Sequence, residues 1–529
     1  MNADAIHGAP GRAEIRIGSS PDTIRMLKTT IRTGTLPGTY VNDGALVQVE
    51  TVSGGLVTAA DDDAPLPVTA SRLTPASLAG LLADHAQVVR TRTRKGPDGT
   101  PEFFDEEVTP PRDVLASVLA TKTWGSLRPL RGIIGAPVLR ADGTLLQTPG
   151  YDEATGFYLA SSFDLPPVPD QPTVEQVRAA RRFLLQDFLG DFPWSGAADR
   201  ANYLALLVAP VLRHYTRSLT PFALIDATMP ASGKTILTAG PGMLYGQRVL
   251  TWPDAEEELR KSITAVFCDP VGCVVFDNLP EGTVIDSAVL AQLVTGKTWA
   301  DRQLGSSRTL SAVNDRLWMA TGNNLQVGGD MASRTVRVHL DPNMPRPENR
   351  DQSRFGIPHL DQWITHPANQ MTVMWHLLVL VGDWICSGAP RCRGLSMRQF
   401  TPWAHALGGF LAHHQVGGFL ANQATVTSID EDAIRWRAFL TCWHTRHGGR
   451  QVTAAELRRD GEPDHIGGDE HDAWEGTFIT THTGRLPNTL SLGRLLTGQV
   501  GRWRGTYVIR TGRNERGDRS VFWVEHHPQ

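Results

Sequence analysis

The fold is decided by the stretch FALIDATMPASGKT, which runs from Phe222 to Thr235. Its first five residues form a short apolar strand, and a helical pattern begins near Ile236. Small residues crowd the loop between them because backbone N–H groups must curl around phosphates. Since the loop lies directly between a strand and a helix, we predict a phosphate-binding loop. Its predicted nucleotide-binding residues are Pro230, Ala231, Ser232, Gly233, Lys234, Thr235 and Ile236.

This loop predicts ATP and Mg²⁺ as ligands. Lys234 supplies a positive charge to the phosphates, the Thr235 hydroxyl reaches Mg²⁺, and the following helix directs its N-terminus at the anion. One position departs from the usual pattern, because Thr228 stands where a glycine normally opens the loop. Threonine is less free than glycine to adopt a positive φ, so we expect a more constrained turn there.

A second apolar strand ends in the carboxylate that such a loop requires. Val274-Val-Phe-Asp277 has the form of a Walker B strand, and Asp277 is predicted to hold Mg²⁺ directly or through water. The next residue is Asn278, where many related ATPases carry a catalytic glutamate. An amide cannot accept a proton from water, so the base must lie elsewhere. The candidates are Glu281 and the run Glu256, Glu257 and Glu258, on a helix that we expect Asp254 to cap.

A third strand and a following arginine complete the predicted site. Leu317–Thr321 is apolar and leads into Gly322-Asn323-Asn324, where the amide of Asn323 can orient the attacking water. Arg334 follows this strand, and an arginine there can neutralise transition-state charge on the ATP of a neighbouring subunit. Arg337 is the alternative.

The chain divides into regions of different pattern. Three candidate hairpins, with turns at Asn42-Asp43-Gly44, Gly96–Gly99 and Asp142-Gly143, predict a β-rich N-terminal domain. After a proline-dense linker, strands alternate with helices, which predicts an α/β core with a parallel sheet. The predicted domains are a β-rich domain at 1–164, a helical collar at 173–216, an α/β P-loop ATPase core at 217–345, a helical lid at 346–428 and a winged-helix-like domain at 429–529.

Composition excludes several classes of protein. The chain has 529 residues and a net charge of −4, so any nucleic-acid contact must come from local patches. Five cysteines without a CxxC pair predict no disulfide framework. The longest apolar stretch, Thr372–Ile385, is interrupted by His376, Gly382 and Asp383, which predicts that it does not span a membrane. A cytoplasmic protein is therefore expected.

The motifs together resemble those of superfamily-three helicases, a hexameric branch of the AAA+ ATPases. The resemblance is carried by the P-loop and then, in order, by VVFDN, ATGNN and SRTVRV. More narrowly, the chain is similar to the primase-associated helicases of phages, plasmids and integrated mobile elements. The similarity covers about 120–529 and includes Leu130–Pro137, Pro149–Gly156 and Arg346–Arg350. The Asp277-Asn278 pair belongs to it.

The resemblance implies a ring of subunits, a hexamer, with ATP bound between neighbours and single-stranded DNA in a central channel. In that arrangement Lys234 and Thr235 bind phosphate and Mg²⁺, Asp277 is the metal acid, Asn323 is the sensor and Arg334 acts on the neighbour's ATP. Forked DNA is the expected substrate.

Many relatives carry an N-terminal primase with an Asp-x-Asp metal pair. Here the nearest acidic cluster is Asp61-Asp62-Asp63, in a loop of alanine, aspartate and proline. We therefore expect a helicase without a primase, and a separate primase as a partner.

Two regions are candidates for contact with DNA. In related helicases the segment between the second and third strands is a β-hairpin that projects into the channel. Here Lys297, Arg302 and Arg308 could grip phosphates, with a salt-dependent strength. The alternative is that these cations bind nucleotide or a neighbouring subunit. Near the C-terminus, a helix at Leu490–Thr497 followed by two strands has the order of a winged helix, which suits duplex DNA.

Three functions are consistent with these motifs. The first is an ATP-dependent, ring-forming helicase that translocates on single-stranded DNA to replicate a phage, plasmid or other mobile element. The second is an AAA+ ATPase that remodels or loads other proteins, for example in phage defence, with DNA as its trigger. The third is a DNA-binding regulator in which nucleotide acts as a switch.

Overall fold

The computed structural model describes residues 12–51, 68–161, 164–269, 271–302, 309–344, 346–423, 431–462, 464–466, 469–471, 474, 476–480, 485–501, 503–504, 506–514 and 519–526. They form two compact units. The first consists of Met1–Thr283, Ser287–Leu325 and Arg334–Asn422, and the second of Val284–Asp286, Gln326–Ser333 and Gln423–Gln529.

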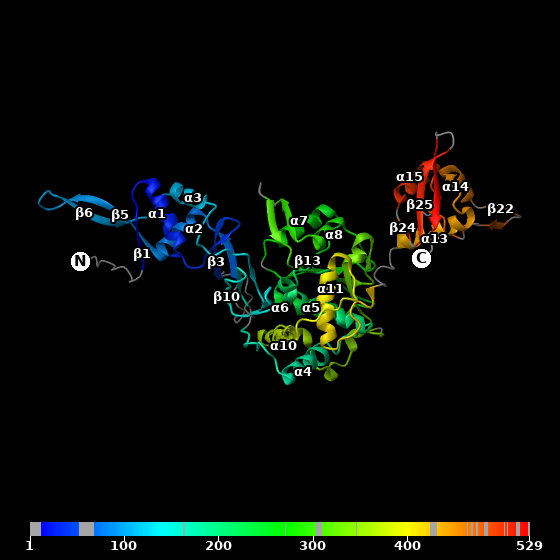
Figure 1. Ribbon diagram of the computed structural model, residues 1–529, viewed down its shortest axis with the longest axis horizontal. Coiled ribbons are helices and arrows are strands. Elements are labelled where there is room, and N and C mark those ends of the chain that lie inside the picture. Colours follow the sequence, from blue (N-terminus) through cyan, green and yellow to red (C-terminus); the bar gives the residue numbers. More distant parts are fainter. Residues whose placement is uncertain are drawn as a thin grey trace. The chain divides into compact units, whose positions relative to one another are not determined.

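The N-terminal region, blue to cyan in Figure 1, mixes helices with strands. Its core is formed by buried aliphatic side chains such as Leu27, Ile31 and Leu78. The elements are β1 (Ala13–Arg16), α1 (Ser20–Arg32), β2 (Thr39–Asn42), β3 (Ala45–Thr51), β4 (Val68–Arg72), α2 (Pro75–His85), β5 (Ala86–Lys95), β6 (Pro101–Glu107), α3 (Arg112–Leu119), β7 (Gly132–Ile134), β8 (Val138–Leu139), β9 (Leu145–Leu146), β10 (Gly150–Tyr151) and β11 (Phe157–Leu159).

The described part of this region contains eleven strands and also three helices, α1, α2 and α3, that were not predicted. In α1 the apolar residues Leu27 and Ile31 recur at helical spacing and are buried, although threonine and isoleucine also favour strands. In α2 Thr74 caps the helix, and the side chains of Thr74 and Ser77 each accept a hydrogen bond from the other's backbone. The helical spacing in α1 and the cap of α2 are local sequence signals for helices, and the turn-rich composition of the region hid them.

All three predicted hairpins are confirmed. Strands β2 and β3 pair antiparallel, and their turn residues Asp43 and Gly44 both have positive φ, of 45° and 69°. Such angles are those of the tight turn that matches strand twist. Strands β5 and β6 pair antiparallel, and so do β8 and β9.

Helices lead from this region into the core. Helix α4 (Val174–Arg182) begins with the expected cap, in which Thr173 and Gln176 satisfy each other's backbone N–H groups. It continues as the π-helical segment η1 (Phe183–Phe188), and α5 (Ala197–Thr216) follows as a mostly buried helix.

The core is a five-stranded parallel sheet in the order β13-β14-β18-β12-β20. Its interior strands are nearly continuous runs of buried apolar residues, as expected for a sheet covered on both faces. Because all strands run the same way, their carboxyl ends meet at one edge, where ligands bind in such sheets. The strands are β12 (Phe222–Ala227), β13 (Gln247–Leu250), β14 (Cys273–Leu279), β18 (Leu317–Asn323) and β20 (Thr335–Leu340).

Connections between these strands carry further elements, drawn in green in Figure 1. Helix α7 begins at Glu256 with Ala255 as its N-cap, so the predicted capping role of Asp254 is wrong. The expected hairpin is confirmed as the antiparallel pair of β16 and β17. The elements are α6 (Lys234–Tyr245), α7 (Glu256–Val266), α8 (Ala288–Thr295), β16 (Thr298–Arg302), β17 (Thr309–Val313) and η2 (Gly329–Arg334).

Helices dominate the chain after the sheet. They pack large buried side chains, including Trp384, Trp403 and Phe410. No helix in the described ranges is long and apolar enough to cross a membrane. The elements are η3 (Pro347–Asn349), η4 (Gln352–Arg354), α9 (Leu360–Trp363), α10 (Pro367–Cys386), η5 (Arg398–Phe400) and α11 (Thr401–His413).

The second unit has its own core, formed around Trp443, Trp474 and Phe522. In the part of this unit that the structure describes, a four-stranded sheet in the order β21-β26-β25-β24 accompanies three helices. A short parallel pair, β15 (Val284–Ile285) with β19 (Gln326–Val327), also belongs to this unit. The other elements are α13 (Glu431–His447), β21 (Val452–Thr453), α14 (Ala454–Asp460), β22 (Asp464–Ile466), β23 (Asp469–His471), α15 (Thr489–Gln499), β24 (Trp503–Arg504), β25 (Tyr507–Arg513) and β26 (Ser520–His526).

Candidate active site

The predicted phosphate loop connects the carboxyl end of β12 to the first residue of α6. Gly233 is the N-cap of α6 and has a φ of 100°, and Ala231 has a φ of 57°. A Cβ at Gly233 would lie 3.2 Å from the ring of Phe192, so glycine is needed both for its backbone conformation and for space. The loop therefore presents the amides of the helix N-terminus to the open edge of the sheet.

Thr228 does not require the conformation that its missing glycine would suggest. The left-handed positions of the loop are Ala231 and Gly233, and Thr228 is not among the residues of positive φ. Its N–H donates to the carbonyl of Leu340 at 3.2 Å, and its hydroxyl donates to Asp341 at 3.2 Å. The expected constraint from threonine is thus absent, because the turn tightens three residues later.

Lys234 reaches across to the neighbouring strand. Its Nζ donates to Oδ1 of Asn323 at 2.7 Å and to the carbonyl of Met229 at 3.4 Å. Burial lowers the pKa of Lys234, while the carboxylates of Asp226 and Asp277 oppose this shift. Strands β12 and β18 are adjacent, so the loop lysine and the predicted sensor amide lie at one sheet edge.

Asp277 lies on β14, directly beside the strand that carries Asn323. Its Oδ1 accepts a hydrogen bond from the hydroxyl of Thr321 at 2.5 Å, and the same hydroxyl accepts from the N–H of Asn278 at 2.9 Å. The register of β14 shifts here, and Asn278 has a φ of 54°. Thr321 therefore fixes the carboxylate, and the structure brings Lys234, Asp277 and Asn323 together.

The residues predicted to bind Mg²⁺ fit a hard cation. Thr235 is exposed at the start of α6, and Asp277 has a second carboxylate oxygen besides the one bonded to Thr321. Mg²⁺ is commonly held by one or two protein oxygens together with waters and substrate phosphates. A hydroxyl and one carboxylate are sufficient for such a site.

The four candidate bases differ in what they contact. Glu281 accepts a hydrogen bond from Nδ2 of Asn324 at 2.8 Å, directly beside the predicted sensor. By contrast, Glu256 accepts from the N–H of Val289 at 3.0 Å, at the start of α8. Glu257 and Glu258 form ion pairs with Lys261 along α7. This geometry favours Glu281.

We expect Glu281→Gln to lower kcat by about 10²–10⁴, because the amide cannot accept a proton from the attacking water. ATP binding should persist, since Glu281 lies beyond the phosphate loop. Steady-state ATPase assays and equilibrium binding of a labelled nucleotide measure the two quantities. Glu257→Gln is the matched control. Equal kcat for Glu281→Gln and the control would exclude Glu281 as the base.

The two candidate arginines behave differently. Arg337 forms two hydrogen bonds with the carboxylate of Asp226, at 3.0 and 2.8 Å, and Asp226 also contacts Nδ1 of His339 at 2.9 Å. These bonds commit Arg337 to its own subunit, which argues against the alternative role predicted for it. Arg334 is half-buried at the end of η2, immediately before β20.

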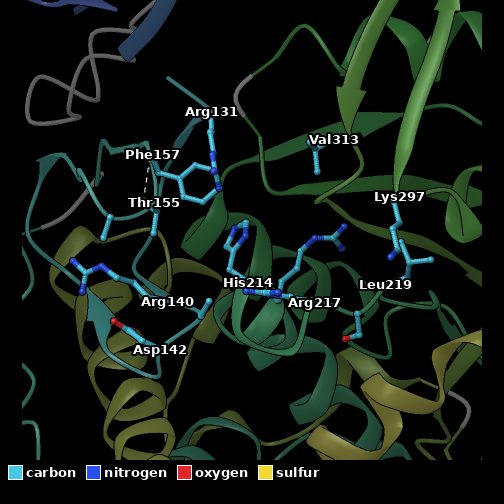
Figure 2. Close-up of a pocket in the computed structure, with 14 residues that line it drawn as sticks. Arg131, Arg140, Asp142, Thr155, Phe157, His214, Arg217, Leu219, Lys297 and Val313 are labelled. Atoms are coloured by element: carbon cyan, nitrogen blue, oxygen red, sulfur yellow. Dashed lines mark hydrogen bonds between the residues drawn. The ribbon is translucent and has the colours of Figure 1, made fainter. Parts of the chain in front are cut away.

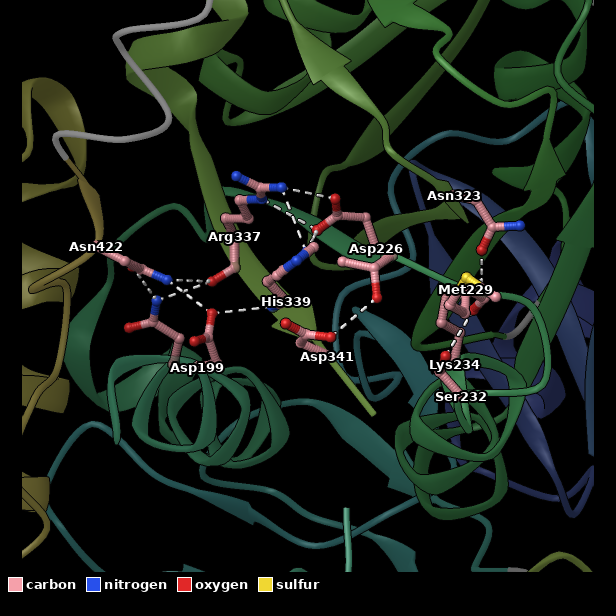
Figure 3. A network of polar contacts seen from close by, with 12 residues as sticks. Asp199, Asp226, Met229, Ser232, Lys234, Asn323, Arg337, His339, Asp341 and Asn422 are labelled. Carbon is pink, nitrogen blue, oxygen red and sulfur yellow. Dashed lines mark hydrogen bonds and ion pairs between the residues drawn. The ribbon is translucent and has the colours of Figure 1, made fainter. Parts of the chain in front are cut away.

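The Asp226 contacts extend into a buried polar network, which Figure 3 draws together with Lys234 and Asn323. The N–H of His339 donates to Asp199 at 2.9 Å, and Asn422 donates to the same carboxylate at 2.8 Å. Asp226 is fully buried. Burial alone would raise the pKa of Asp226, but the hydrogen bonds from His339 and Arg337 outweigh it and lower the pKa. The network joins the strand before the phosphate loop to β20 and α5.

We expect Asp226→Asn to reduce the free energy of unfolding by about 3–5 kcal/mol, because it leaves the Arg337 charge buried without its partner. The folded-state pKa of Asp226 is depressed, so its contribution is complete above the unfolded pKa of about 4 and is lost as pH falls through the lower folded value. Urea unfolding measured between pH 7 and 3 tests both the loss of unfolding free energy and its dependence on pH. The exposed Asp351→Asn is the control, and similar effects from the two variants would contradict the prediction.

A cavity of about 120 Å³ adjoins the loop and was missed by sequence reasoning. Three aromatic residues, Phe188, Phe192 and Phe355, line it beside Gly233. The guanidinium of Arg350 lies 4.7 Å from the ring centroid of Phe355. It also donates a hydrogen bond to the backbone carbonyl of Asp191. Of these residues, only Arg350 had been noted in the sequence, because it lies in a motif of the resembled family. The three aromatic residues carried no sequence signal.

The residues predicted to touch DNA lie on or beside the hairpin. Lys297 immediately precedes β16 and is exposed, and Arg302 is the last residue of β16. Arg308 lies outside the described residues, as do Asp61–Asp63. Near the end of β16, Asp301 pairs with Arg260 at 3.5 Å, so part of the local charge is used within the fold.

Comparison with known proteins gives weak matches. No family model and no curated protein matches the chain. Among solved structures, the C-terminal region of NrS-1 aligns with a TM-score of 0.37 and 11% identity, covering 86% of this chain and 100% of that one. The SCCmec type IV helicase Cch gives 0.30 and 9%, covering 83% and 90%. JCV helicase gives 0.23 and 16%, covering 48% and 66%. Because these TM-scores are low, the function is inferred from the site residues.

Proposed function

We propose that this chain is an ATP-dependent DNA helicase of the AAA+ superfamily-three type. The observation that carries the proposal is the 2.7 Å contact between Lys234 and Asn323 on adjacent strands, with Asp277 held beside them by Thr321. A loop lysine, a carboxylate and an amide at the carboxyl edge of a parallel sheet are the parts needed for phosphoryl transfer from ATP to water.

Each residue has a distinct task in this proposal. Lys234 and the amides of residues 230–236 bind the phosphates, and Thr235 and Asp277 hold Mg²⁺, which supplies charge neutralisation on the phosphate oxygens. Asn323 positions the attacking water and Glu281 accepts its proton. Asn278 keeps the Asp277 turn in shape. The aromatic cavity beside Gly233 suits the adenine base.

We further propose that subunits assemble into a hexameric ring, in which Arg334 reaches the ATP of a neighbour. Single-stranded DNA would pass along the β16–β17 hairpin, close to Lys297 and Arg302. The helix–strand order of the second unit supports a winged helix that contacts duplex DNA. Replication of a phage, plasmid or other mobile element, with a separate primase, belongs to the same proposal, as do the domain limits predicted from the sequence.

A forked DNA duplex with a fluorophore and quencher tests this function. We expect ATP- and Mg²⁺-dependent strand separation by the full chain, and none with a non-hydrolysable ATP analogue. DNA-stimulated ATP hydrolysis without strand separation would overturn the helicase proposal in favour of a remodelling or loading ATPase. Binding of DNA that responds to nucleotide without any hydrolysis would instead favour a regulator.

A further inference from the structure

A second and larger cavity lies in the first unit, away from the phosphate loop. It has a volume of about 540 Å³, which is within the range of sites that bind nucleotide-sized ligands. Its walls come from the 131–157 segment, from the C-terminal end of α5 and from the base of the β16–β17 hairpin. Figure 2 shows Arg131, Arg217 and Lys297 approaching it from these three parts of the chain.

The walls of this cavity are strongly basic. Four cations, Arg131, Arg213, Arg217 and Lys297, line it, together with the carboxylate of Asp142, and the charge of Asp315 acts on Arg213. A fifth, Arg140, is paired with Asp152 at 2.8 Å. Cations in the last turn of α5 also offset the negative end of the helix dipole. That explanation does not extend to Arg131 and Lys297, which belong to other elements.

The cavity also offers two aromatic rings against which a base could lie. The rings of Phe157 and His214 lie with centroids 4.6 Å apart at an interplanar angle of 49°. Burial lowers the pKa of His214, so this imidazole is neutral at pH 7 and adds a ring rather than a charge. Aromatic surfaces next to cationic groups are how proteins bind the bases and phosphates of single strands.

The position of the cavity relates it to the hairpin. Lys297 and Asn314 close the base of the hairpin through a hydrogen bond from the Asn314 N–H to the Lys297 carbonyl, 2.9 Å long. Val313, which pairs with Thr298 in the hairpin, is 58% exposed at the cavity wall. A strand that follows the hairpin from Arg302, the last residue of β16, to Lys297 at its base therefore reaches the cavity.

We propose that this cavity binds one nucleotide unit of single-stranded DNA, with the phosphate between Arg131, Arg217 and Lys297 and the base against Phe157. The proposal deepens the helicase function and rests on it for the identity of the strand. A free nucleotide offers the same chemistry, but continuity with the hairpin favours a polymer. Bound here, the strand would be held between the hairpin and the N-terminal region.

The test uses the full chain with Arg131→Gln and Arg217→Asn combined, because asparagine tolerates the left-handed backbone of Arg217, whose φ is 52°. Fluorescence anisotropy of a labelled oligothymidylate, measured over a range of salt, gives the affinity and its salt slope. We expect binding at low salt to weaken at least about tenfold and the slope to fall by about 0.7, since the cavity holds one phosphate and each lost phosphate contact on a single strand removes about 0.7.

Two further measurements keep the outcome decisive. Arg25→Gln, which removes an exposed arginine of α1, is the control and should bind as the wild type does. If the double variant does not fold, Lys297→Gln takes its place. This change of an exposed side chain that faces the same phosphate should weaken binding and lower the slope, by at most about 0.7. Unchanged affinity and slope in the variants, with normal binding by the wild type, would overturn this inference alone, whereas a wild type that does not bind DNA would overturn the helicase proposal.

Thymidine monophosphate distinguishes a strand from a free nucleotide. Its binding is measured by calorimetry in the Lys234→Ala background, so that the phosphate loop contributes little. We expect it to bind far more weakly than the oligonucleotide. Binding as tight as that of the oligonucleotide, lost in the double variant, would identify a free-nucleotide site and overturn the proposal for a strand.

Discussion

Lys234→Ala is expected to lower ATP hydrolysis by at least about 10²–10³ and to abolish strand separation. The side chain is the charge at the phosphate loop, and its ammonium donates a hydrogen bond to Asn323 at 2.7 Å. A donor fixed in advance loses no energy to reorganisation during the reaction, which is why removing one such group has effects of this size. ATPase rate and forked-duplex unwinding measure the two losses.

Lys261→Ala is the matched control for this change, because Lys261 is a lysine of α7 that pairs with Glu257 and Glu258 on the surface. Lys234→Arg should also fail, since a guanidinium does not replace a compact ammonium in a half-buried loop. ATP hydrolysis at the wild-type rate by Lys234→Ala would rule out the phosphate-loop assignment altogether. If Lys261→Ala retains ATP hydrolysis and Lys234→Ala does not, the result supports the phosphate-loop assignment.

Arg334→Ala is expected to reduce kcat by about 10³–10⁵ while ATP binding and assembly persist. An arginine that acts on transition-state charge from a neighbouring subunit has effects of this order. Mixing Arg334→Ala subunits with Lys234→Ala subunits provides a sharper measurement. If the arginine acts between subunits, mixed rings contain interfaces with an intact lysine on one side and an intact arginine on the other, so part of the activity returns.

Activity that stays absent at every mixing ratio, despite mixed assembly, would contradict action between subunits. Arg337→Ala separates this role from a structural one. Arg337 is bonded to Asp226 within its own subunit, so its loss should lower stability rather than only kcat. A variant of Arg334 that is destabilised to the same extent as Arg337→Ala would place Arg334 in the same structural class.

Much of the core was predictable because a polar candidate site residue stands at the carboxyl end of each apolar strand. Three short, buried strands each have a polar residue at the carboxyl edge of the sheet. These residues are Asp226, Asp277 and Asn323. Adjacent parallel strands bring such residues together whatever their separation in sequence. The strand order itself, which places β18 between β12 and β14, comes from the structure.

Contacts between distant segments could not be predicted in the same way. Phe192 packs against the Cβ position of Gly233, and nothing near either residue in the sequence indicates this. The choice among four glutamates depended on a hydrogen bond from Asn324 to Glu281. In the N-terminal region, α1 was hidden because its threonines and isoleucines also suit a strand, and only burial of Leu27 and Ile31 decides the matter.

The left-handed backbone of Asn278 limits which residue could replace it by evolution or redesign. Asparagine adopts positive φ more readily than other residues with a side chain, whereas a glutamate there would begin with a conformational cost of about 1–2 kcal/mol. Grafting the commoner Asp-Glu pair onto this strand would therefore strain the turn that aims Asp277. Under the proposed function, the group that accepts the proton would lie outside the strand that carries Asp277, so that a change of this group would leave the Asp277 carboxylate in place.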